Sequence, residues 1–360
     1  MKRKKTKKKI ALIIVISLIV LSIVGLGVFS VSIYNENFNC RFESYEPLMY
    51  YVDDFDGLRR TKYEFNSDKG QKLAGYLYSS GEGQKGIVVL AHGFGAGHNS
   101  YMDFANYFAH NGYYVFAYDA TGNDESEGEG VGGMPQGAID LDYAISFVEE
   151  SGKFPELPIV LFGHSWGGYS VCSVLTYHPE VKAVIESSGA NRSSDYFEAV
   201  GKKQAGDVIY TMMPFIKLHE LIKYGKYALN TSMDGFKSSE AAVMIVHSED
   251  DGVVPIEYGY DLYYKTYKDD PRFTFVRFED KGHNRVYNST AYTAYVDELN
   301  EKIEKWGETL NYDYKENKEQ FAMNKADYIH KNLDREKWSD SLNTEMLDGF
   351  LSFYDKNING

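Results

Sequence analysis

Cysteine, proline and metal-ligand spacings are scarce in this chain. Its 360 residues include two cysteines and eight prolines. None of the nine histidines pairs with another His or with a Cys at the i,i+4 or C-x-x-C spacing that zinc sites need, so we expect no metal and no cofactor. Cys40 and Cys172 could form one disulfide, but Cys172 lies among apolar residues and is expected to be a buried free thiol. Neither cysteine is expected to be catalytic.

Positive charge is scarce beyond the first nine residues. Lys and Arg occupy seven of positions 2–9, and removing these seven charges from the net charge of −14 leaves the rest of the chain near −21. This acidity disfavours nucleic acid as a partner of the folded part. The 31 Tyr and 21 Phe argue against disorder, and the length suits one large domain or two small ones. The abundance of Lys, Tyr and Asn, together with few prolines, points to a bacterial source.

Charge is absent from residues 10–33, which are dominated by Ile, Leu and Val. About 20 apolar residues span a bilayer, so this segment predicts a transmembrane anchor. A cleaved signal peptide is the alternative, but the run is longer than the usual ~7–15 residues and only Ser30-Val31-Ser32 approaches a cleavage site. Because Lys and Arg favour the cytoplasm, residues 1–9 are expected inside. We therefore expect a single-pass protein of the cell membrane whose main domain lies outside the cytoplasm.

Apolar strands alternate with helical stretches from residue 61 onward, after a polar, aromatic stalk over residues 34–60. A hairpin opens the series, and further strands are expected at 86–91, 113–118, 159–162, 181–186, 242–247 and 273–278. Helices between strands imply right-handed crossovers and a mostly parallel, doubly wound sheet. The alternation stops at about residues 190–239, which we interpret as a helical cap over the site. The main domain is expected to span 61–306, followed by a helical C-terminal extension over 307–360 packed on it.

The run from Val160 to Gly168 contains Gly163-His164-Ser165-Trp166-Gly167, a Gly-x-Ser-x-Gly pattern between a strand and a helix. A nucleophilic serine on a sharp strand-to-helix turn needs small neighbours, which explains glycine at 163 and 167. The pattern alone occurs by chance in many chains. The other catalytic groups must therefore follow in the right order.

Two later loops, each directly after an apolar strand, provide those groups. Parallel strands end on one rim of the sheet, so these loops and Ser165 are expected to meet there. The loop at 280–284 contains His283, which we predict to be the base. The loop at 247–255 contains three adjacent carboxylates, Glu249, Asp250 and Asp251, and residue chemistry alone does not choose the acid among them.

These motifs resemble those of α/β-hydrolases, in particular the serine aminopeptidase and monoacylglycerol lipase-like group, over about residues 60–306. The resemblance implies the α/β-hydrolase fold. It places the acid on Asp251, because residues 247–255 match the family's His-Gly-x-x-Asp-x-x-Val-Pro with Ser248 in place of Gly. It also implies an oxyanion hole formed by the backbone N–H groups of Phe94, after His92-Gly93, and of Trp166.

A departure from the family pattern lies at residues 119–128. This loop resembles Asp-x-Arg-Gly-x-Gly-x-Ser-x-Gly, but Thr121 replaces the Arg and Asp124 replaces the second Gly. The departure puts the local conformation of the loop in question rather than the chemistry.

The leading hypothesis is a membrane-anchored serine hydrolase that cleaves carboxylic esters or amides through an acyl-enzyme on Ser165, with His283 as base and Asp251 orienting it. A serine aminopeptidase-type peptidase is the first alternative, and it would need a cap acid such as Glu198, Asp207 or Glu220 to bind the substrate's amine. The second alternative is a non-catalytic envelope binding protein. Expected partners are a small ester, a lipid-like molecule or a short peptide, and the membrane through the N-terminal helix.

Overall fold

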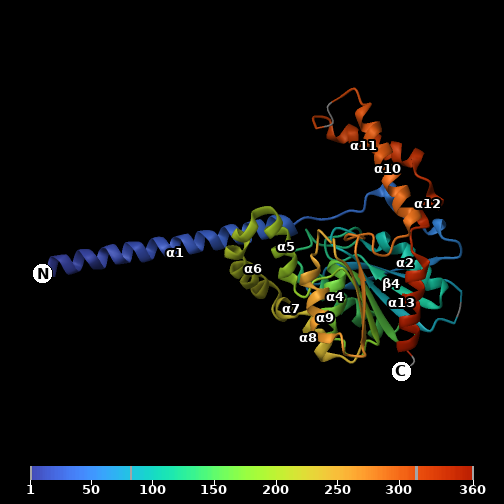
Figure 1. Cartoon of the computed structure of the whole chain (residues 1–360), viewed down its shortest axis with the longest axis horizontal. Coiled ribbons are helices and arrows are strands. Elements are labelled where there is room, and N and C mark those ends of the chain that lie inside the picture. The colour runs from blue at the N-terminus through green and yellow to red at the C-terminus, as the bar shows by residue number, and fades with distance from the viewer. Residues whose placement is uncertain (1, 82, 313–314, 359–360) are drawn as a thin grey trace.

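One eight-stranded sheet forms the centre of the molecule in a computed structural model that describes residues 2–81, 83–312 and 315–358 (Figure 1). The strands lie in the order β1-β2-β4-β3-β5-β6-β7-β8. Their bounds are β1 (Arg59–Asn66), β2 (Lys72–Ser79), β3 (Gly86–Ala91), β4 (Tyr113–Tyr118), β5 (Ile159–His164), β6 (Ala183–Ser187), β7 (Ala242–Ser248) and β8 (Phe273–Phe278). The pairs β1–β2 and β2–β4 are antiparallel, and all the others are parallel. The predicted opening hairpin and mostly parallel sheet are confirmed.

The central strands are apolar on both faces because helices cover both faces. All six residues of β3 are buried. Val88 and Leu90 belong to one core cluster, whereas Ile87 and Val89 belong to the other, as alternation along a strand requires. The first cluster includes side chains of α2 (Met102–His110) and α13 (Thr344–Asn357). The second includes side chains of α3 (Pro135–Glu150), α4 (Trp166–Ser173) and α9 (Tyr260–Tyr267).

Helix α4 starts earlier than the sequence pattern indicates. The Gly-x-Ser-x-Gly pattern leads into a helix, and α4 already begins at Trp166, directly after Ser165, and ends at Ser173, where a 3₁₀ turn follows. The early start follows from the turn at Ser165, which leads straight from β5 into the helix. The Trp166 N–H therefore lies in the first helical turn, where backbone donors have no partner within the helix.

Four helices lie between β6 and β7, where the alternation of strands and helices stops. They are α5 (Ser193–Ala205), α6 (Ile209–Tyr224), α7 (Lys226–Leu229) and α8 (Ser232–Ser238). In Figure 1, α5 and α6 lie beside the end of α1 (Lys2–Phe38), and α1 and α6 are in contact. Helix α1 is long and apolar enough to cross a membrane over Lys8–Phe38. Its first part extends away from the rest of the molecule (Figure 1).

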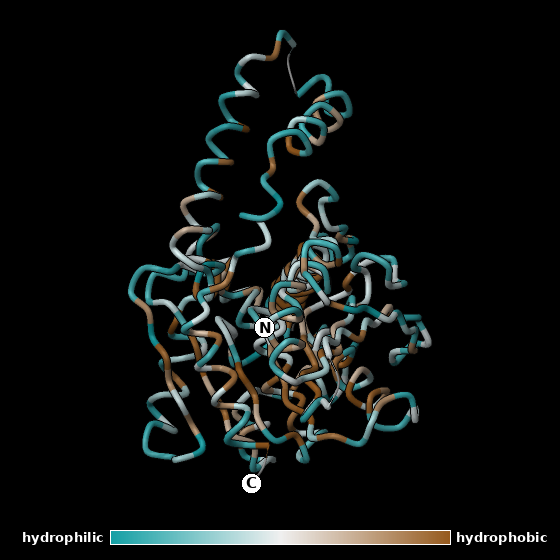
Figure 2. Tube along the Cα trace, turned by 90° about the vertical axis from the view of Figure 1, so that its right-hand side faces the viewer, coloured by the Kyte–Doolittle hydropathy of each residue, from teal (hydrophilic) through white to brown (hydrophobic). Residues whose placement is uncertain are grey.

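The chain after β8 leaves the sheet and then returns to it. Helices α10 (Thr290–Glu308), α11 (Lys318–Asn332) and α12 (Arg335–Ser339) form a mostly hydrophilic excursion above the body (Figure 2). Within α10 the one buried residue is Leu299. The helix that covers the sheet is α13, which buries Leu347 and Phe350, and whose Tyr354 hydroxyl donates to the Leu161 carbonyl at 2.7 Å.

Candidate active site

The backbone at Ser165 forms a sharp turn between β5 and α4. Ser165 has φ 56° and ψ −117°, a conformation that costs energy for any residue except glycine. A Cβ at position 163 would lie 2.2 Å from the Gly167 carbonyl oxygen, and one at position 167 would lie 2.0 Å from the Ala91 carbonyl oxygen. Both glycines are therefore required by close backbone approach, and the strained turn presents Ser165 at the end of the sheet.

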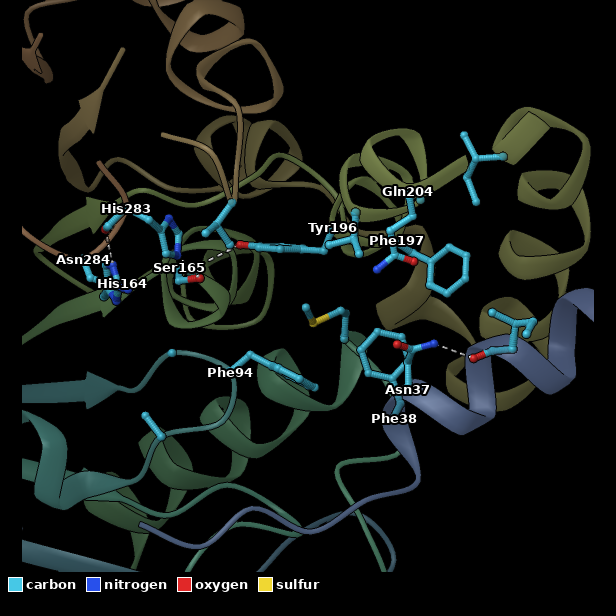
Figure 3. Close-up of a pocket in the computed structure, with 18 of the residues that line it drawn as sticks. Asn37, Phe38, Phe94, His164, Ser165, Tyr196, Phe197, Gln204, His283 and Asn284 are labelled. Carbon is cyan, nitrogen blue, oxygen red and sulfur yellow. Dashed lines mark hydrogen bonds between the residues drawn. The ribbon is translucent and has the colours of Figure 1, made fainter. Parts of the chain in front are cut away.

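Three of the predicted side chains meet at this rim. His283 Nε2 lies 2.8 Å from Ser165 Oγ, and His283 Nδ1 lies 2.7 Å from Asp251 Oδ2. Asp251 follows β7 and His283 follows β8, so both come from loops at the carboxyl ends of strands. Ser165 and His283 lie next to each other at one end of the cavity in Figure 3. This chain of hydrogen bonds has the geometry of a nucleophile, a base and an orienting acid.

The three adjacent carboxylates have different partners. Glu249 pairs with Arg277 at 2.7 Å on the exposed surface. Asp250 accepts hydrogen bonds from the Ser248 hydroxyl at 2.6 Å and from the Gly282 N–H at 2.8 Å. Among the described residues, only Asp251 of these three contacts the His283 ring.

Asp251 is held as a carboxylate by several donors. Its Oδ1 accepts the N–H groups of Val253 and Val254 at 2.8 and 2.9 Å, and His247 Nε2 lies 3.2 Å from Oδ2. Burial alone would raise the pKa of Asp251, but the hydrogen bonds from His247 and His283 outweigh burial and hold this pKa well below its usual value. Asp251 therefore accepts a proton from neither imidazole at neutral pH.

A second set of polar side chains, which the sequence reasoning missed, connects the elbow to the base. Gly93 N–H donates to the Tyr101 hydroxyl oxygen at 3.1 Å, and this hydroxyl lies 2.9 Å from His164 Nδ1. His164 Nε2 lies 3.0 Å from the His283 backbone oxygen. A carbonyl can only accept, so Nε2 carries the proton and Nδ1 accepts from Tyr101. Burial lowers the pKa of His164 to about 3, so this imidazole stays neutral. The sequence showed His164 only as a residue beside a glycine turn.

Two further buried groups lie behind Asp251. Glu186, on β6, accepts a hydrogen bond from the Gly189 N–H, and burial raises the pKa of its carboxyl group to about 7. Burial alone would lower the pKa of His247, but the hydrogen bond to Asp251 and the charge of Glu186 raise it. No sequence signal identified Glu186, because its importance depends on strand neighbours rather than on a motif.

The two predicted oxyanion donors rest on backbone position. Phe94 follows β3, Trp166 opens α4, and their rings lie 5.8 Å apart in an edge-to-face contact. Among the residues that the structure describes, neither backbone N–H donates a hydrogen bond. Both amides are therefore free to bind an oxygen atom, and their assignment to the oxyanion hole stays a prediction.

A cavity of about 750 Å³ opens from Ser165 (Figure 3). Its walls are lined by residues of α1, of the rim and of the α5–α6 region, and Figure 3 labels Asn37, Phe38, Phe94, His164, Ser165, Tyr196, Phe197, Gln204, His283 and Asn284 among them. None of its described lining residues is Asp, Glu, Lys or Arg. Tyr196 of α5 reaches the elbow, where its hydroxyl donates to the Ser165 carbonyl at 2.7 Å. The cavity is therefore suited to an uncharged, largely apolar ligand.

The cap acids named as amine ligands lie outside this cavity. Glu220 is buried between the Tyr34 and Ser193 hydroxyls at 2.7 and 2.8 Å, and Glu198 lies 3.3 Å from the Tyr258 hydroxyl. Asp207 is exposed in a 3₁₀ turn between α5 and α6. None of the three lines the cavity.

One cluster has the spacing to hold a metal ion. The ligand atoms of Glu149, His178 and Glu180 lie within 4.8 Å of one another. None of the three lines the cavity, and His178 Nε2 is already 2.9 Å from Asp142. This cluster is explained by the pairing of one histidine with surface carboxylates. Both cysteines are free, and Cys172 is buried in α4.

The departures in the 119–128 loop have structural explanations. The Thr121 N–H and hydroxyl donate to Asp140 at 2.7 and 3.0 Å. Asp124, at φ 37°, accepts from the Ser44 N–H and hydroxyl at 2.5 and 2.7 Å. Asp124 thus binds the segment that follows α1, which glycine at this position cannot do.

Comparisons with known proteins address the fold and the family. The family described as serine aminopeptidase, S33, matches residues 82–234. An esterase from Pyrococcus furiosus superimposes in two crystal forms with TM-scores of 0.52 and 0.51, at 17% and 16% identity, over 71% of this chain and 92% of that one. The chain has the α/β-hydrolase fold. At this identity the structural likeness establishes the fold alone.

A curated relative of this α/β-hydrolase is a monoacylglycerol lipase from Mycolicibacterium smegmatis. It is 27% identical over 137 residues, which make up 38% of this chain and 49% of that protein. The match therefore spans about half the length of the relative.

Proposed function

We propose that this α/β-hydrolase is a membrane-anchored serine esterase that cleaves carboxylic esters through an acyl-enzyme on Ser165. The observation that supports this most strongly is the Ser165–His283–Asp251 chain at one end of a cavity without charged lining residues. No cofactor takes part in the proposed reaction. We also propose the division into a basic segment (1–9), an anchor (10–33), a stalk (34–60), a hydrolase domain (61–306) with a cap at about 190–239, and an extension (307–360).

The first half of the reaction forms the acyl-enzyme. Ser165 Oγ attacks the ester carbonyl carbon while His283 Nε2 takes the hydroxyl proton. The carbonyl oxygen becomes an oxyanion, which the N–H groups of Phe94 and Trp166 stabilise; one such donor typically lowers the barrier by about 3 kcal/mol. His283 then gives its proton to the alcohol oxygen as the carbon–oxygen bond breaks, and the alcohol leaves.

Water completes the cycle through the same groups. His283 Nε2 takes a proton from water, the hydroxide attacks the acyl carbon, and the returned proton releases Ser165 with a free carboxylic acid. Asp251 holds the Nδ1–H tautomer and stabilises the imidazolium that forms twice in each cycle. His164, which bonds the His283 backbone, positions the loop that carries the base.

An ester is favoured over a peptide with a free N-terminus. The aminopeptidase alternative needs a carboxylate beside the substrate's ammonium group, because an unpaired buried cation is costly. The cavity wall offers none among its described residues, and Glu220 is already bonded to Tyr34 and Ser193. The non-catalytic alternative does not explain the strained backbone of Ser165 or the hydrogen bond between Ser165 and His283.

The proposed location is the cell membrane, with one spanning helix and the hydrolase domain outside the cytoplasm. The length and apolar composition of α1 and the basic residues before it support this topology. The lipase name of the Mycolicibacterium relative is consistent with a substrate drawn from lipids.

A fluorophosphonate probe, which reacts with activated serines, tests the proposal on the full chain in detergent micelles. We expect one adduct on Ser165, none in Ser165→Ala, and an adduct in the matched control Ser173→Ala, whose serine lies in α4 away from the cavity. p-Nitrophenyl esters should be hydrolysed and aminoacyl amides left intact. A folded wild-type protein without an adduct on Ser165 would sink the proposal, and turnover of aminoacyl amides alone would favour the peptidase.

A further inference from the structure

The last turns of α1 form one wall of the cavity. Phe29, Ile33, Asn37 and Phe38 line it, and the first three are spaced four residues apart, so they lie on one face of the helix. A helix that served only as an anchor would not need to contribute side chains to the cavity that contains Ser165. Helix α1 therefore forms part of the site as well as the anchor.

The opposite wall comes from α5, α6 and the turn between them. Its apolar lining consists of Phe197, Val200, Ala205, Val208, Ile209 and Met212. Among the described lining residues that α1 and this region contribute, the polar side chains are those of Asn37, Tyr196 and Gln204. Between Phe29 and Ser165 the cavity is thus lined mostly by apolar side chains. Such a lining suits an alkyl chain better than a polar leaving group.

Specific contacts hold α1 against the cap. Tyr34 donates to the buried Glu220 at 2.7 Å, and Ser193 of α5 donates to the other oxygen of the same carboxylate at 2.8 Å. A Cβ at Gly27 would lie 2.9 Å from the Phe215 ring of α6, so the glycine permits this close approach. The wall is therefore fixed in place by a buried hydrogen-bond pair and by tight packing.

The segment after α1 is fixed as well. Arg41 donates to the backbone oxygens of Ser126, Gly128 and Asp124 at 2.9, 2.7 and 2.8 Å. Asp124, which replaces glycine in the family pattern, binds Ser44 from the other side. The departure of the 119–128 loop from the family pattern thus adds contacts that hold the segment after α1 beside the site.

The depth of the wall follows from helix geometry. The charge-free run begins at Ile10, and a rise of about 1.5 Å per residue covers a hydrocarbon core of about 30 Å near residue 29. Phe29 then lies at the boundary between lipid and water, and Ile33 and Asn37 lie beyond it. Val208, Leu218 and Ile222 of the cap are large, apolar and exposed on the protein. A bilayer surface beside the cap would cover such side chains.

We infer that α1 is both the anchor and one wall of the acyl-binding site, so that the substrate is an ester with a long acyl chain that enters from the adjacent half of the bilayer. This inference rests on the proposed function. The acyl chain lies between Phe29 and Ile33 of α1 and the α5–α6 wall, with its carbonyl carbon at Ser165. Hydrolysis consumes one water, breaks the acyl carbon–oxygen bond, and releases an alcohol and a fatty acid.

A photoreactive probe tests where the acyl chain lies. The full chain is placed in phosphatidylcholine nanodiscs and treated with a long alkyl fluorophosphonate that carries a diazirine at the chain end. After attachment and irradiation, we expect peptide mapping to find crosslinks within residues 26–38. Crosslinks confined to other segments or to lipid, on a protein labelled at Ser165, would overturn the inference while leaving the proposed function intact. Absence of any Ser165 adduct would overturn both.

Matched substitutions on the two faces of α1 test specificity. Ile33→Trp fills the cavity, whereas Val28→Trp introduces the same side chain, with a slightly larger gain in volume, at a 67% exposed position that does not line it. The readout is the ratio of kcat/KM for a p-nitrophenyl palmitate to that for the acetate, in the same nanodiscs. We expect Ile33→Trp to lower this ratio about 10-fold or more, and Val28→Trp to change it by less than about 2-fold.

Phe29→Ala is a second variant. Because Phe29 is 56% exposed, this substitution should not disturb the packing of the protein core. It removes part of the wall at the cavity mouth, so the same ratio should fall about 3-fold through a higher KM for the long ester. Val28→Ala, at a position that does not line the cavity, is the matched control and should leave hydrolysis of both esters unchanged. An unaltered ratio in both Ile33→Trp and Phe29→Ala, or an equal fall in Val28→Trp, would contradict the α1 wall.

Discussion

The two ends of the cavity are built in different ways. At the rim, backbone turns and short hydrogen bonds fix Ser165, His283 and Asp251, and neighbouring glycines leave no space for larger residues. At the other end, apolar side chains of α1 and the cap form the wall, with one buried hydrogen-bond cluster at Glu220. Under the proposed function, reactivity would depend on the main-chain geometry of the rim, whereas selectivity would depend on packing between segments far apart in the sequence.

The largest expected effect at the rim comes from Asp251→Asn. The amide removes the charge that stabilises the imidazolium and can hold His283 in the wrong tautomer, so kcat/KM for p-nitrophenyl acetate should fall about 10³- to 10⁴-fold. Asp250→Asn and Glu249→Gln are the matched controls and should each retain activity within about 5-fold, because neither carboxylate meets the imidazole. An equal loss in Asp250→Asn would show that the acid is misassigned.

A pair of glycine substitutions compares the rigidity of the two ends. Gly167→Ala places a Cβ 2.0 Å from the backbone oxygen of Ala91, which cannot move away cheaply, and should cost about 3 kcal/mol or more of unfolding free energy. Gly201→Ala places one 2.4 and 2.5 Å from Cδ1 and Cγ1 of Ile209, which are side-chain atoms that a rotamer change can move, and the better helix propensity of Ala should keep the net cost to about 1 kcal/mol. Urea unfolding in micelles measures both variants. Similar costs would remove the contrast between rim and wall.

Glu186 makes the stability of the rim depend on pH, whereas the apolar wall has no such dependence. The carboxyl pKa is raised from 4.5 to about 7 by burial, so its contribution to stability is present at pH 5 and lost as pH rises through 7. The glutamine of Glu186→Gln does not titrate. Between pH 5 and pH 8 the unfolding free energy of this variant should therefore rise by about 2 kcal/mol relative to that of the wild type.

Urea unfolding at the two pH values checks this, and Glu279→Gln at an exposed position is the control. A Glu186→Gln difference from wild type that is the same at pH 5 and pH 8 would refute the assigned environment of Glu186.

The smallest effect is expected at the wall. Tyr34→Phe removes one hydrogen bond to Glu220, which keeps its bond from Ser193, so the unfolding free energy should fall by about 1 kcal/mol. Tyr51→Phe, which loses an exposed bond to Glu46, should change it by less than about 0.5 kcal/mol. Acetate hydrolysis should be unaffected in both. Strongly reduced acetate hydrolysis in folded Tyr34→Phe would mean that the wall and the rim are coupled.

The sheet was predictable because local signals agree with the fold. The strands at 86–91 and 113–118 lie where the apolar runs indicated, since buried parallel strands need no partner information to be recognised. Ser165 and His283 were predicted from glycine spacing and strand ends, and the structure brings them within hydrogen-bond distance. The choice of Asp251 needed the family resemblance, because three adjacent carboxylates look alike until their partners are known.

The rest depended on contacts that no local pattern encodes. His164 and Tyr101 act through hydrogen bonds to residues more than 60 positions away. The α1 wall requires Phe29 and Ile33 to meet a cap whose sequence has no readable motif. Nor does a local pattern tell that α10 buries only Leu299, while α13 covers the sheet. Which of the two amphipathic helices packs on the sheet depends on tertiary contacts.

Trapping the acyl-enzyme tests the central claim most directly. The full chain in micelles is mixed with excess p-nitrophenyl palmitate, quenched with acid within milliseconds, and analysed by intact mass and peptide mapping. The account predicts a burst of p-nitrophenol and a palmitoyl group on the peptide that contains Ser165, with neither in Ser165→Ala. Steady turnover with no acylated Ser165, or with the acyl group on another residue, would contradict it.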